Sequence, residues 1–336
     1  MKTAVIGASG YLGAELLRLL ARHPAFEVAL AQGDRSAGER VATLHPGLEK
    51  DYPDLVVEPL SPESASRADV VFVALPSGHS QDVVAELVDA TRVVDLGADF
   101  RLREAKSYEQ WYGFTHRHEA LLAKAVYGLP ELNRAALVGA SLIAAPGCYV
   151  TAAALALVPL LEAGVIEPGG VIVDAASGVS GAGREPTATT HFGAVNENFS
   201  AYGLVDHRHT PEIEQVTGAE VLFTPHLAPM TRGILVTAYA RATASRPSEE
   251  LLAIVAERYG GERFVEVVEH SPGTRETYGS NLAKLTVRSS PRTGQVIALC
   301  AIDNLTKGGA GQAIQAANIA CGIGEASGLD VLPVVP

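Results

Sequence analysis

The chain of 336 residues contains only three cysteines, widely spaced, so the sequence predicts no disulfide framework and favours a reducing compartment. No apolar run reaches the roughly 20 residues that a membrane-spanning helix needs. Lys and Arg number 26 against 38 Asp and Glu, and the net charge of −12 argues against nucleic acid or an anionic membrane as a partner. A strand pattern starts at Thr3, which leaves no room for a signal peptide. We therefore expect a cytoplasmic protein.

The first part of the chain alternates short apolar runs with helical patterns. With 47% hydrophobic and 19% charged residues, the chain is globular and long enough for two domains. The candidate strands are residues 3–6, 27–31, 55–58, 70–74, 93–95 and 142–144. The candidate helices are residues 12–22, 62–66, 80–89 and 117–124. This alternation predicts an α/β fold with a Rossmann-type, doubly wound parallel sheet.

Beyond about residue 145 the pattern changes to longer alternating runs, which predict a mostly antiparallel α+β domain for catalysis and oligomerisation. These runs are residues 171–176, 219–224, 232–242, 282–288 and 295–302. An Ala-rich helix at about 309–322 is expected to pack back on the first domain. The predicted nucleotide-binding domain is therefore 1–147 plus about 305–336, and the second domain is 148–304.

A glycine-rich turn follows the first candidate strand. Gly7, Gly10 and Gly13 are spaced three apart and an amphipathic helix follows them. Glycine is needed where the backbone turns tightly, approaches a pyrophosphate and packs helix on strand, and the pyrophosphate then lies at the helix N-terminus. The alternative is a glycine-rich turn that binds no ligand.

Cys148 stands directly before an apolar, Ala-rich run and directly after Pro146-Gly147, so we expect it on the first turn of a helix. Unpaired N–H groups and the helix dipole stabilise a thiolate there, and the thiolate is the nucleophilic form of cysteine. The alternative is a small buried hydrophobe. Cys300 and Cys321 lie in a strand-like run and an Ala-rich helix, and both are expected to be core residues.

A series of segments, taken in order, resembles the N-acetyl-γ-glutamyl-phosphate reductases, a family related to aspartate-semialdehyde dehydrogenase. They are residues 7–13, 74–80, 95–101, 127–131, 146–149, 177–184, 207–213, 225–233 and 303–305. The resemblance implies NADPH-dependent reduction of an acyl phosphate to an aldehyde in arginine biosynthesis, with phosphate released from a thioester on Cys148. It also implies a homo-oligomer, a dimer or a tetramer.

The chain departs from this family in two segments. Ala145 and Val150 replace the Asn and the second Pro of the family's Asn-Pro-Gly-Cys-Tyr-Pro-Thr, so one contact to the thioester oxygen is in doubt unless backbone N–H groups supply it. Asp34 stands in the segment that usually reads Thr-Ser-Arg-Ser.

A related family that reduces a carrier-linked aminoadipyl phosphate in lysine synthesis lacks the Pro-Gly before its cysteine, and this chain has it.

The reaction needs a proton donor and acceptor beside the sulfur, and the candidates are His207 and His209. We expect Thr210 to cap a helix whose N-terminus lowers the pKa of an adjacent histidine. The sequence gives no ground for choosing between the two. No third ligand accompanies their His-x-His spacing, so no metal is expected.

Candidate binding residues come from the same segments. The substrate candidates, chosen chiefly because guanidinium groups bind phosphate or carboxylate, are Arg101, Tyr149, Arg184, Arg208 and Arg232. The NADP(H) candidates are Gly7, Ser9, Gly10, Tyr11, Leu12, Gly13, Arg35, Ser36, Pro76, Ser77, Ser177, Gly178, Gly181 and Asn304. Arg35 is suited to a 2′-phosphate, whereas Asp34 would favour the free ribose hydroxyl of NAD.

Three alternatives stay open at this point. One is a reductase of another acyl phosphate, aspartyl or aminoadipyl. The second is a cysteine hydrolase or acyl-transfer enzyme, for which the opening turn is only structural. The third is a dinucleotide-binding sensor without catalysis.

Overall fold

The computed structural model describes residues 1–335 and divides into two compact units. The first unit is Met1–Pro146 with Gly309–Asp330, and the second is Gly147–Gly308 with the last residues from Val331 onward. The predicted first domain reached about 305–336, of which residue 336 lies outside the described residues. Residues near both ends of that range instead bond within the second unit. Thr306 Oγ1 accepts a hydrogen bond from Arg232, and the Val334 N–H donates to the Tyr278 carbonyl.

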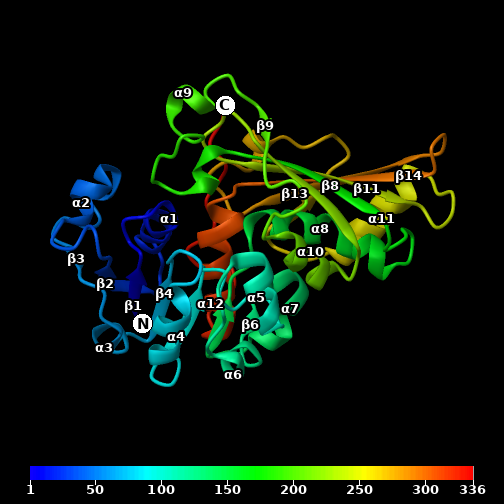
Figure 1. Cartoon of the computed structure of the whole chain (residues 1–336). Coiled ribbons are helices and arrows are strands. Elements are labelled where there is room, and N and C mark those ends of the chain that lie inside the picture. The colour runs from blue at the N-terminus through cyan, green and yellow to red at the C-terminus, as the bar shows by residue number, and fades with distance from the viewer. Residues whose placement is uncertain (336) are drawn as a thin grey trace. The chain divides into compact units, whose positions relative to one another are not determined.

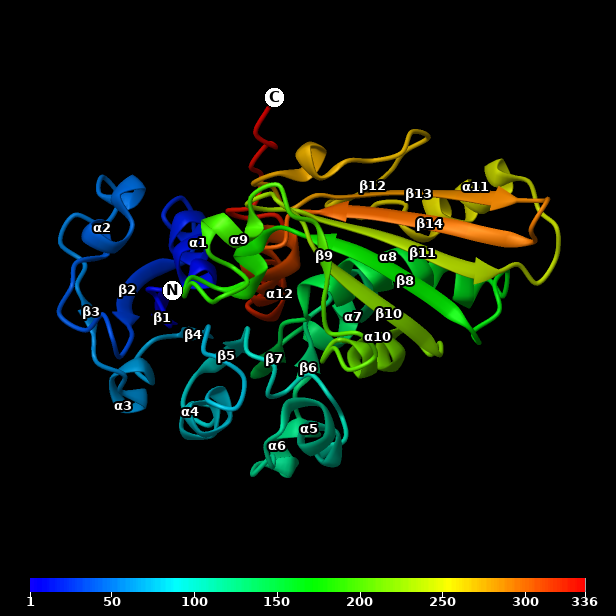
Figure 2. The same ribbon diagram turned by 45° about the horizontal axis from the view of Figure 1, so that its top comes forward.

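Seven strands of the described chain form the parallel sheet of the first unit, in the order β3-β2-β1-β4-β5-β7-β6 (Figures 1 and 2). All six neighbouring pairs are parallel, as expected of a doubly wound fold. The strands are β1 Lys2–Ile6, β2 Glu27–Gln32, β3 Val57–Glu58, β4 Val70–Val73, β5 Arg92–Asp95, β6 Val126–Tyr127 and β7 Leu142–Ala144. The predicted fold class is confirmed for this unit.

Helices cover both faces of this sheet. They are α1 Tyr11–Leu20, α2 Val41–Leu44, α3 Pro62–Ala65, α4 Ser80–Leu87, α5 Ala105–Tyr112, α6 Glu119–Leu122, α7 Pro130–Leu137 and α12 Gly311–Ala320. In the first unit the sequence analysis missed α2, α5, α7 and β6. It did predict the C-terminal helix, and α12 packs with α1, α7 and β5, as predicted.

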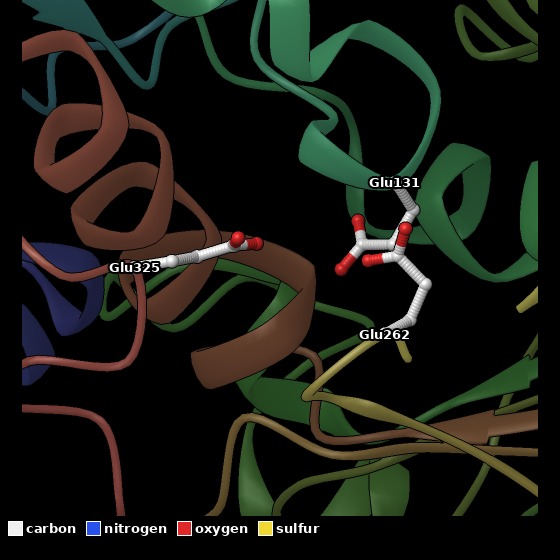
Figure 3. A group of neighbouring side chains, drawn as sticks. All are labelled: Glu131, Glu262 and Glu325. Carbon is white, nitrogen blue, oxygen red and sulfur yellow. The ribbon is translucent and has the colours of Figure 1, made fainter. Parts of the chain in front are cut away.

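Helix α12 is held by buried polar contacts as well as by its alanines. The Gln312 amide donates to the Gly128 carbonyl at 3.2 Å. The Gln315 amide donates to Glu131 at 3.0 Å and to Glu325 at 2.7 Å, two of the carboxylates drawn in Figure 3. Arg134 of α7 adds two parallel hydrogen bonds to Glu325. Residues far apart in the chain thereby complete one unit.

The second unit is a mixed sheet with the order β12-β13-β14-β11-β8-β10-β9 among the described residues (Figure 2). Its strands are β8 Val171–Ser177, β9 Ser200–Ala201, β10 Val221–Leu227, β11 Ile234–Arg241, β12 Val265–Val267, β13 Ala283–Ser290 and β14 Gln295–Ile302. Four of its six pairs are antiparallel, and β8/β10 and β12/β13 are parallel. The predicted, mostly antiparallel α+β domain is confirmed.

One face of this second sheet is covered by α8 Cys148–Glu162, α10 Thr210–Thr217 and α11 Ser248–Arg258, and a short helix, α9, spans Phe192–Val195. Successive side chains of each strand point to opposite faces of the sheet, and those that face the helices are buried. On the other face Ile172 and Leu222 are 39% and 52% exposed. Short 3₁₀ turns lie at Pro46–Leu48, Val179–Ala182 and Thr274–Thr277, and a π-helical turn at Thr306–Ala310.

In the part of the chain that the structure describes, no helix combines the length and the apolar character needed to cross a membrane.

Candidate active site

Cys148 is the first residue of helix α8, where the sequence predicted it. The preceding Gly147 is extended, with φ −66° and ψ 145°, and has no side chain to cap the helix. The first turn carries no acidic residue, so its N–H groups face the thiol without a competing carboxylate of their own turn. The thiol is half-buried. This is the electropositive, partly accessible setting that makes a cysteine reactive.

Two glycines let other groups approach Cys148 closely. A Cβ atom at Gly308 would lie 2.8 Å from the Cβ of Cys148. A Cβ atom at Gly147 would lie 2.6 Å from Nε2 of His209, so the imidazole of His209 packs directly on the backbone that precedes the thiol. A larger residue at either position would push the nucleophile or the histidine away.

His207 and His209 lie against each other, with ring centroids 4.9 Å apart. The His209 backbone N–H donates to Nδ1 of His207 at 3.1 Å, so the proton of a neutral His207 sits on Nε2. Aromatic rings of Tyr149, Tyr202 and Phe223 surround His207 at 5.1–5.8 Å. Burial, with help from the neighbouring Arg208, lowers the pKa of His207 to about 4.

Glu212 is a candidate site residue to which the sequence analysis assigned no role. Its carboxylate is fully buried, and Oε1 accepts the Gly147 N–H at 2.9 Å. Helix α10 begins at Thr210, with His209 as its N-cap, one residue earlier than predicted. Glu212 therefore ties the start of α10 to the start of α8, and this fixes the position of His209 relative to Cys148.

A pocket of about 590 Å³ opens beside the thiol within the second unit. Its lining includes hydroxyl, imidazole, guanidinium and aromatic side chains. The lining residues are Cys148, Tyr149, Ser177, Gly178, Gly181, Ala182, Thr187, Ala188, Thr189, Thr190, Ala194, Asn198, Ser200, Ala201, Tyr202, His207, Arg208, His209 and Leu227. This volume suits a small molecule.

The four predicted substrate arginines have different surroundings. Arg208 is exposed and lines the pocket. Arg232 makes two parallel hydrogen bonds at 2.9 Å to the fully buried Asp303. Arg101 donates to the backbone carbonyls of Ala145 and Leu96, both at 2.8 Å, and Arg184 lies on an exposed segment outside the pocket lining. The structure therefore brings Arg208, but not Arg232 or Arg184, into the pocket wall.

The glycine-rich turn of the first unit has the geometry of a phosphate cradle. Gly7 has φ +85°, and a Cβ atom there would lie 2.3 Å from the Ala74 carbonyl oxygen. A Cβ atom at Gly13 would lie 2.2 Å from the carbonyl oxygen of Gly7. Helix α1 starts after Gly10 with no side-chain cap and no acidic residue in its first turn. Its free N–H groups suit a pyrophosphate, so these residues fit a dinucleotide.

Other predicted cofactor residues gather near this turn. A Cβ atom at Gly33 would lie 3.4 Å from Ser36 Oγ and 3.7 Å from Ser9 Oγ, so both serines meet at the ends of β1 and β2. Tyr11 and Leu12 open helix α1 and are partly accessible, whereas Asp34 and Arg35 are exposed. Pro76 and Ser77 precede α4, where Asp99 accepts the N–H groups of Gly78, Ser80 and Gln81 at 2.7–3.0 Å.

The predicted cofactor residues of the second unit also lie together. The Asn304 amide donates to Ser180 Oγ at 3.0 Å, and its oxygen accepts the Gly233 N–H at 2.7 Å. A Cβ atom at Gly181 would lie 3.0 Å from Ser177 Oγ and 3.7 Å from the Asn304 amide nitrogen. A Cβ atom at Gly178 would lie 2.7 Å from the Thr231 backbone. Ser177, Gly178 and Gly181 share the pocket lining with Cys148.

Both units match known domain families. A family described as semialdehyde dehydrogenase, NAD binding domain, matches residues 2–140. A family described as semialdehyde dehydrogenase, dimerisation domain, matches residues 148–304.

Curated relatives are similar over nearly the whole chain. The chain is 49% identical to the N-acetyl-gamma-glutamyl-phosphate reductase of Desulforudis audaxviator, over 98% of each chain. It is 46% identical to that of Moorella thermoacetica over 100% of each, and 48% identical to that of Symbiobacterium thermophilum over 100% of this chain and 99% of the relative.

Solved structures show the same fold at low sequence identity. Aspartate semialdehyde dehydrogenase with NADP from Candida albicans superposes with a TM-score of 0.71 at 18% identity, covering 95% of this chain and 98% of that one. Aspartate semialdehyde dehydrogenase II complexed with ASA from Vibrio cholerae gives a TM-score of 0.70 at 18% identity, covering 95% and 97%.

Proposed function

The chain belongs to the N-acetyl-γ-glutamyl-phosphate reductases of the semialdehyde dehydrogenase family, and on this premise we propose that it reduces N-acetyl-L-glutamyl 5-phosphate to N-acetyl-L-glutamate 5-semialdehyde. Phosphate is released, NADPH is the reductant and the reaction serves arginine biosynthesis in the cytoplasm. The observation that carries the proposal is Cys148 at the uncapped start of α8, with His209 packed on the preceding residue.

Cys148 is the nucleophile. Its thiolate attacks the acyl carbon, the bond from that carbon to the phosphate oxygen breaks, and phosphate leaves with the electron pair. The product is a thioester on Sγ. Reduced nicotinamide, when bound, would supply a hydride to the thioester carbon, which leaves the negative charge on the former carbonyl oxygen. As this oxygen re-forms its double bond to carbon, the carbon–sulfur bond breaks, the aldehyde is released and Sγ leaves with the electron pair as the thiolate.

His209 is the base that takes the proton of Cys148. Its ring packs on Gly147, and Glu212 holds the N–H of that same glycine, so the histidine and the thiol are fixed to one short piece of backbone. A base that exchanges protons must lie within hydrogen-bond reach of the sulfur.

His207 has a different role. Its pKa of about 4 keeps it neutral at physiological pH, and the His209 N–H occupies its Nδ1. Only the Nε2–H is then available, so His207 is a hydrogen-bond donor to a substrate oxygen and not a proton acceptor. Arg208, which lines the pocket, is positioned to attract an anionic group of the substrate.

Arg232 and Arg101 act mainly on the protein itself. The paired bonds of Arg232 to Asp303 support a role in holding the loop that carries Asn304. The bonds of Arg101 to two backbone carbonyls support a role in fixing the end of β5.

The turn from Gly7 to Gly13 would hold the pyrophosphate of NADP(H), and Ser9 and Ser36 the adenosine ribose. Ser177, Gly178, Gly181 and Asn304 would border the nicotinamide. The first unit is accordingly the NADP-binding domain, and the second is the catalytic and oligomerisation domain.

We also infer a homo-oligomer, built through the open face of the second sheet. Ile172 and Leu222 are exposed there, and Leu235, Tyr239 and Ile297 are half-buried on the same face. Contiguous apolar surface of this kind is typical of subunit interfaces. The matched dimerisation domain family covers these strands.

The pKa of His207 predicts how its contribution to stability changes with pH. Because the folded-state pKa is about 4 and the ordinary value is 6.5, the unfolded chain binds the proton more readily. The contribution of His207 to the free energy of unfolding is therefore fully present above pH 6.5, and it should fall by about 2–3 kcal/mol as the pH drops to 4. Urea unfolding of the parent and of His207→Asn across this range measures the difference.

The comparison with His207→Asn removes an opposing contribution. Burial and the neighbouring Asp99 raise the pKa of Asp95 to about 7. Ionisation of this carboxyl therefore lowers the stability of the folded protein as the pH rises. It is present in both proteins and cancels. If parent and variant show the same pH dependence, His207 is not buried in its neutral form.

Arg35→Ala tests cofactor choice. A charge-assisted bond from Arg35 to the 2′-phosphate predicts that the substitution raises KM for NADPH about tenfold or more and leaves KM for NADH nearly unchanged. Arg40→Ala, an exposed arginine of the same region, is the matched control. A parent that prefers NADH, or an equal effect on both cofactors, would assign specificity to Asp34.

The proposed reaction is tested in reverse, as phosphate-dependent reduction of NADP⁺ by N-acetylglutamate semialdehyde, followed at the nicotinamide absorbance. Aspartate semialdehyde and a carrier-linked aminoadipate semialdehyde are the comparators. Preference for a comparator would overturn the substrate assignment. Ester turnover without nicotinamide would indicate a cysteine hydrolase.

A further inference from the structure

The carbonyl group of Ala8, inside the glycine-rich turn, is bound by a histidine that lies 37 positions further along the chain. Nε2 of His45 is 2.9 Å from the Ala8 carbonyl oxygen. A carbonyl can only accept a hydrogen bond, so Nε2 carries the proton and the imidazole is the donor. His45 has no role in the proposed function, yet it reaches the turn to which the dinucleotide is assigned.

This contact fixes the orientation of one peptide group of the turn. Ala8 is held on both sides, because its N–H donates to the Gln32 carbonyl at 3.1 Å while its carbonyl accepts from His45. In a trans peptide the C=O group and the N–H group of the next residue point in opposite directions. The N–H of Ser9 is therefore directed away from His45. The imidazole thus determines how this part of the turn presents its backbone.

The surroundings of Ala8 leave little room for another arrangement. Ala8 is fully buried, so water does not reach its carbonyl group in place of His45. A Cβ atom at Gly13 would lie 2.7 Å from the Ala8 Cα, so helix α1 packs directly on this residue. A buried carbonyl that loses its donor bears the full cost of its desolvation. The peptide can relieve that cost only by rotating, and rotation redirects the Ser9 N–H.

His45 is itself held by the segment around it. It joins helix α2 to the 3₁₀ turn Pro46–Leu48, and its backbone N–H donates to the Val41 carbonyl at 2.8 Å. At the other end of the segment 45–52, the buried Tyr52 hydroxyl donates to the Leu17 carbonyl of helix α1 at 2.9 Å. The segment therefore places one side-chain donor on the turn and another on the helix that follows it.

We propose that His45 is a positioning residue for the cofactor, and that it holds the Ala8 peptide in the orientation with which the turn from Gly7 to Gly13 receives the pyrophosphate of NADP(H). This inference rests on the proposed function, which assigns the dinucleotide to that turn. The pyrophosphate is common to NADPH and NADH, whereas the 2′-phosphate proposed to bind Arg35 belongs to NADPH alone. His45 should therefore act on both cofactors by the same factor.

The experiment removes the donor and then restores it. His45→Leu lacks a donor, and we expect the Kd values for NADPH and NADH, from fluorescence titration, each to rise about fivefold to fiftyfold. The kcat at saturating NADPH and the KM for the acyl phosphate should stay within about twofold of the parent, because the acyl-transfer site is unchanged. His45→Gln carries an amide N–H in place of the Nε2–H and should bring both Kd values back to within about threefold of the parent.

Tyr52→Phe is the matched control. It removes a side-chain donor from the same segment, but one that bonds helix α1 and not the turn. It should lower the Tm and leave both Kd values within about twofold of the parent. Thermal unfolding checks that each variant folds. If His45→Leu does not fold, His45→Met, whose side chain is flexible and also lacks a donor, provides the same test.

The outcomes separate this inference from the proposed function. A parent that binds neither cofactor would overturn the proposed function itself. With a parent that binds, unchanged affinity in His45→Leu, or equal weakening in His45→Gln or Tyr52→Phe, would overturn only the role of His45. A loss confined to NADPH would place His45 at the 2′-phosphate and would likewise contradict its action through the Ala8 peptide.

Discussion

Replacing Cys148 by serine should lower kcat at least about 10³-fold while leaving the affinity for NADPH unchanged. The uncapped first turn of α8 stabilises a thiolate, but a serine hydroxyl ionises far less readily, and the same helix terminus cannot make up the difference. The nucleotide turn lies in the other unit and does not depend on the sulfur. The measurements are steady-state reduction and NADPH titration by fluorescence.

A trapping experiment gives this prediction an independent control. Rapid quench of the parent with labelled acyl phosphate, in the absence of NADPH, should leave label on Cys148 as a thioester. Cys321→Ser, at the end of α12, is the matched variant and should retain activity. Turnover by Cys148→Ser within tenfold of the parent, or the absence of a labelled thioester, would contradict covalent catalysis.

His209→Asn should cost roughly 10²–10⁴ in kcat, the usual range for loss of a general acid or base. The reason is its place against Gly147 and the buried Glu212, which fix it beside the nucleophile. His207→Asn should act more on KM, because His207 serves as a neutral donor. The pH profile of kcat/KM supplies a second readout, since only removal of the base should abolish its acidic limb.

The reverse pattern would assign the base to His207. Equal, small losses at both histidines would remove this segment from the proton transfer altogether. A Glu212→Gln variant helps to separate these outcomes, because its amide can keep a carbonyl oxygen for the Gly147 N–H while it loses the negative charge.

Long, strongly patterned elements were predictable from the sequence, and short ones were not. Strand β14, Gln295–Ile302, coincides with its predicted range because a run of alternating residues defines both of its ends. Strands β6 and β9 contain two residues each, too few for a period of two to stand out. Helix α5 has only one fully buried side chain, that of Tyr108, so few of its residues need to be apolar.

The candidate site was predictable where its residues are neighbours in the sequence. Cys148 after Pro146-Gly147 marks a helix start, and the observed α8 begins there. The contacts of Glu212 and Tyr202 join segments more than 50 residues apart, with Gly147 and Tyr149 respectively. Neither contact leaves a mark in local composition. The surroundings of Arg232 depended likewise on Asp303, which lies 71 positions further along the chain.

Helix α12 also determines when the first unit can finish folding. Its alanines and Ile314 are buried against elements that the ribosome made some 170 residues or more earlier, counted from the end of β7. Until those residues emerge, α1, α7 and β5 lack the helix that packs against them, and the amide groups of Gln312 and Gln315 have not reached the Gly128 carbonyl and Glu131. Folding of the N-terminal unit is thus tied to completion of the whole chain, instead of proceeding domain by domain during synthesis. A fragment ending at Pro146 would lack this helix and expose the apolar surface beneath it.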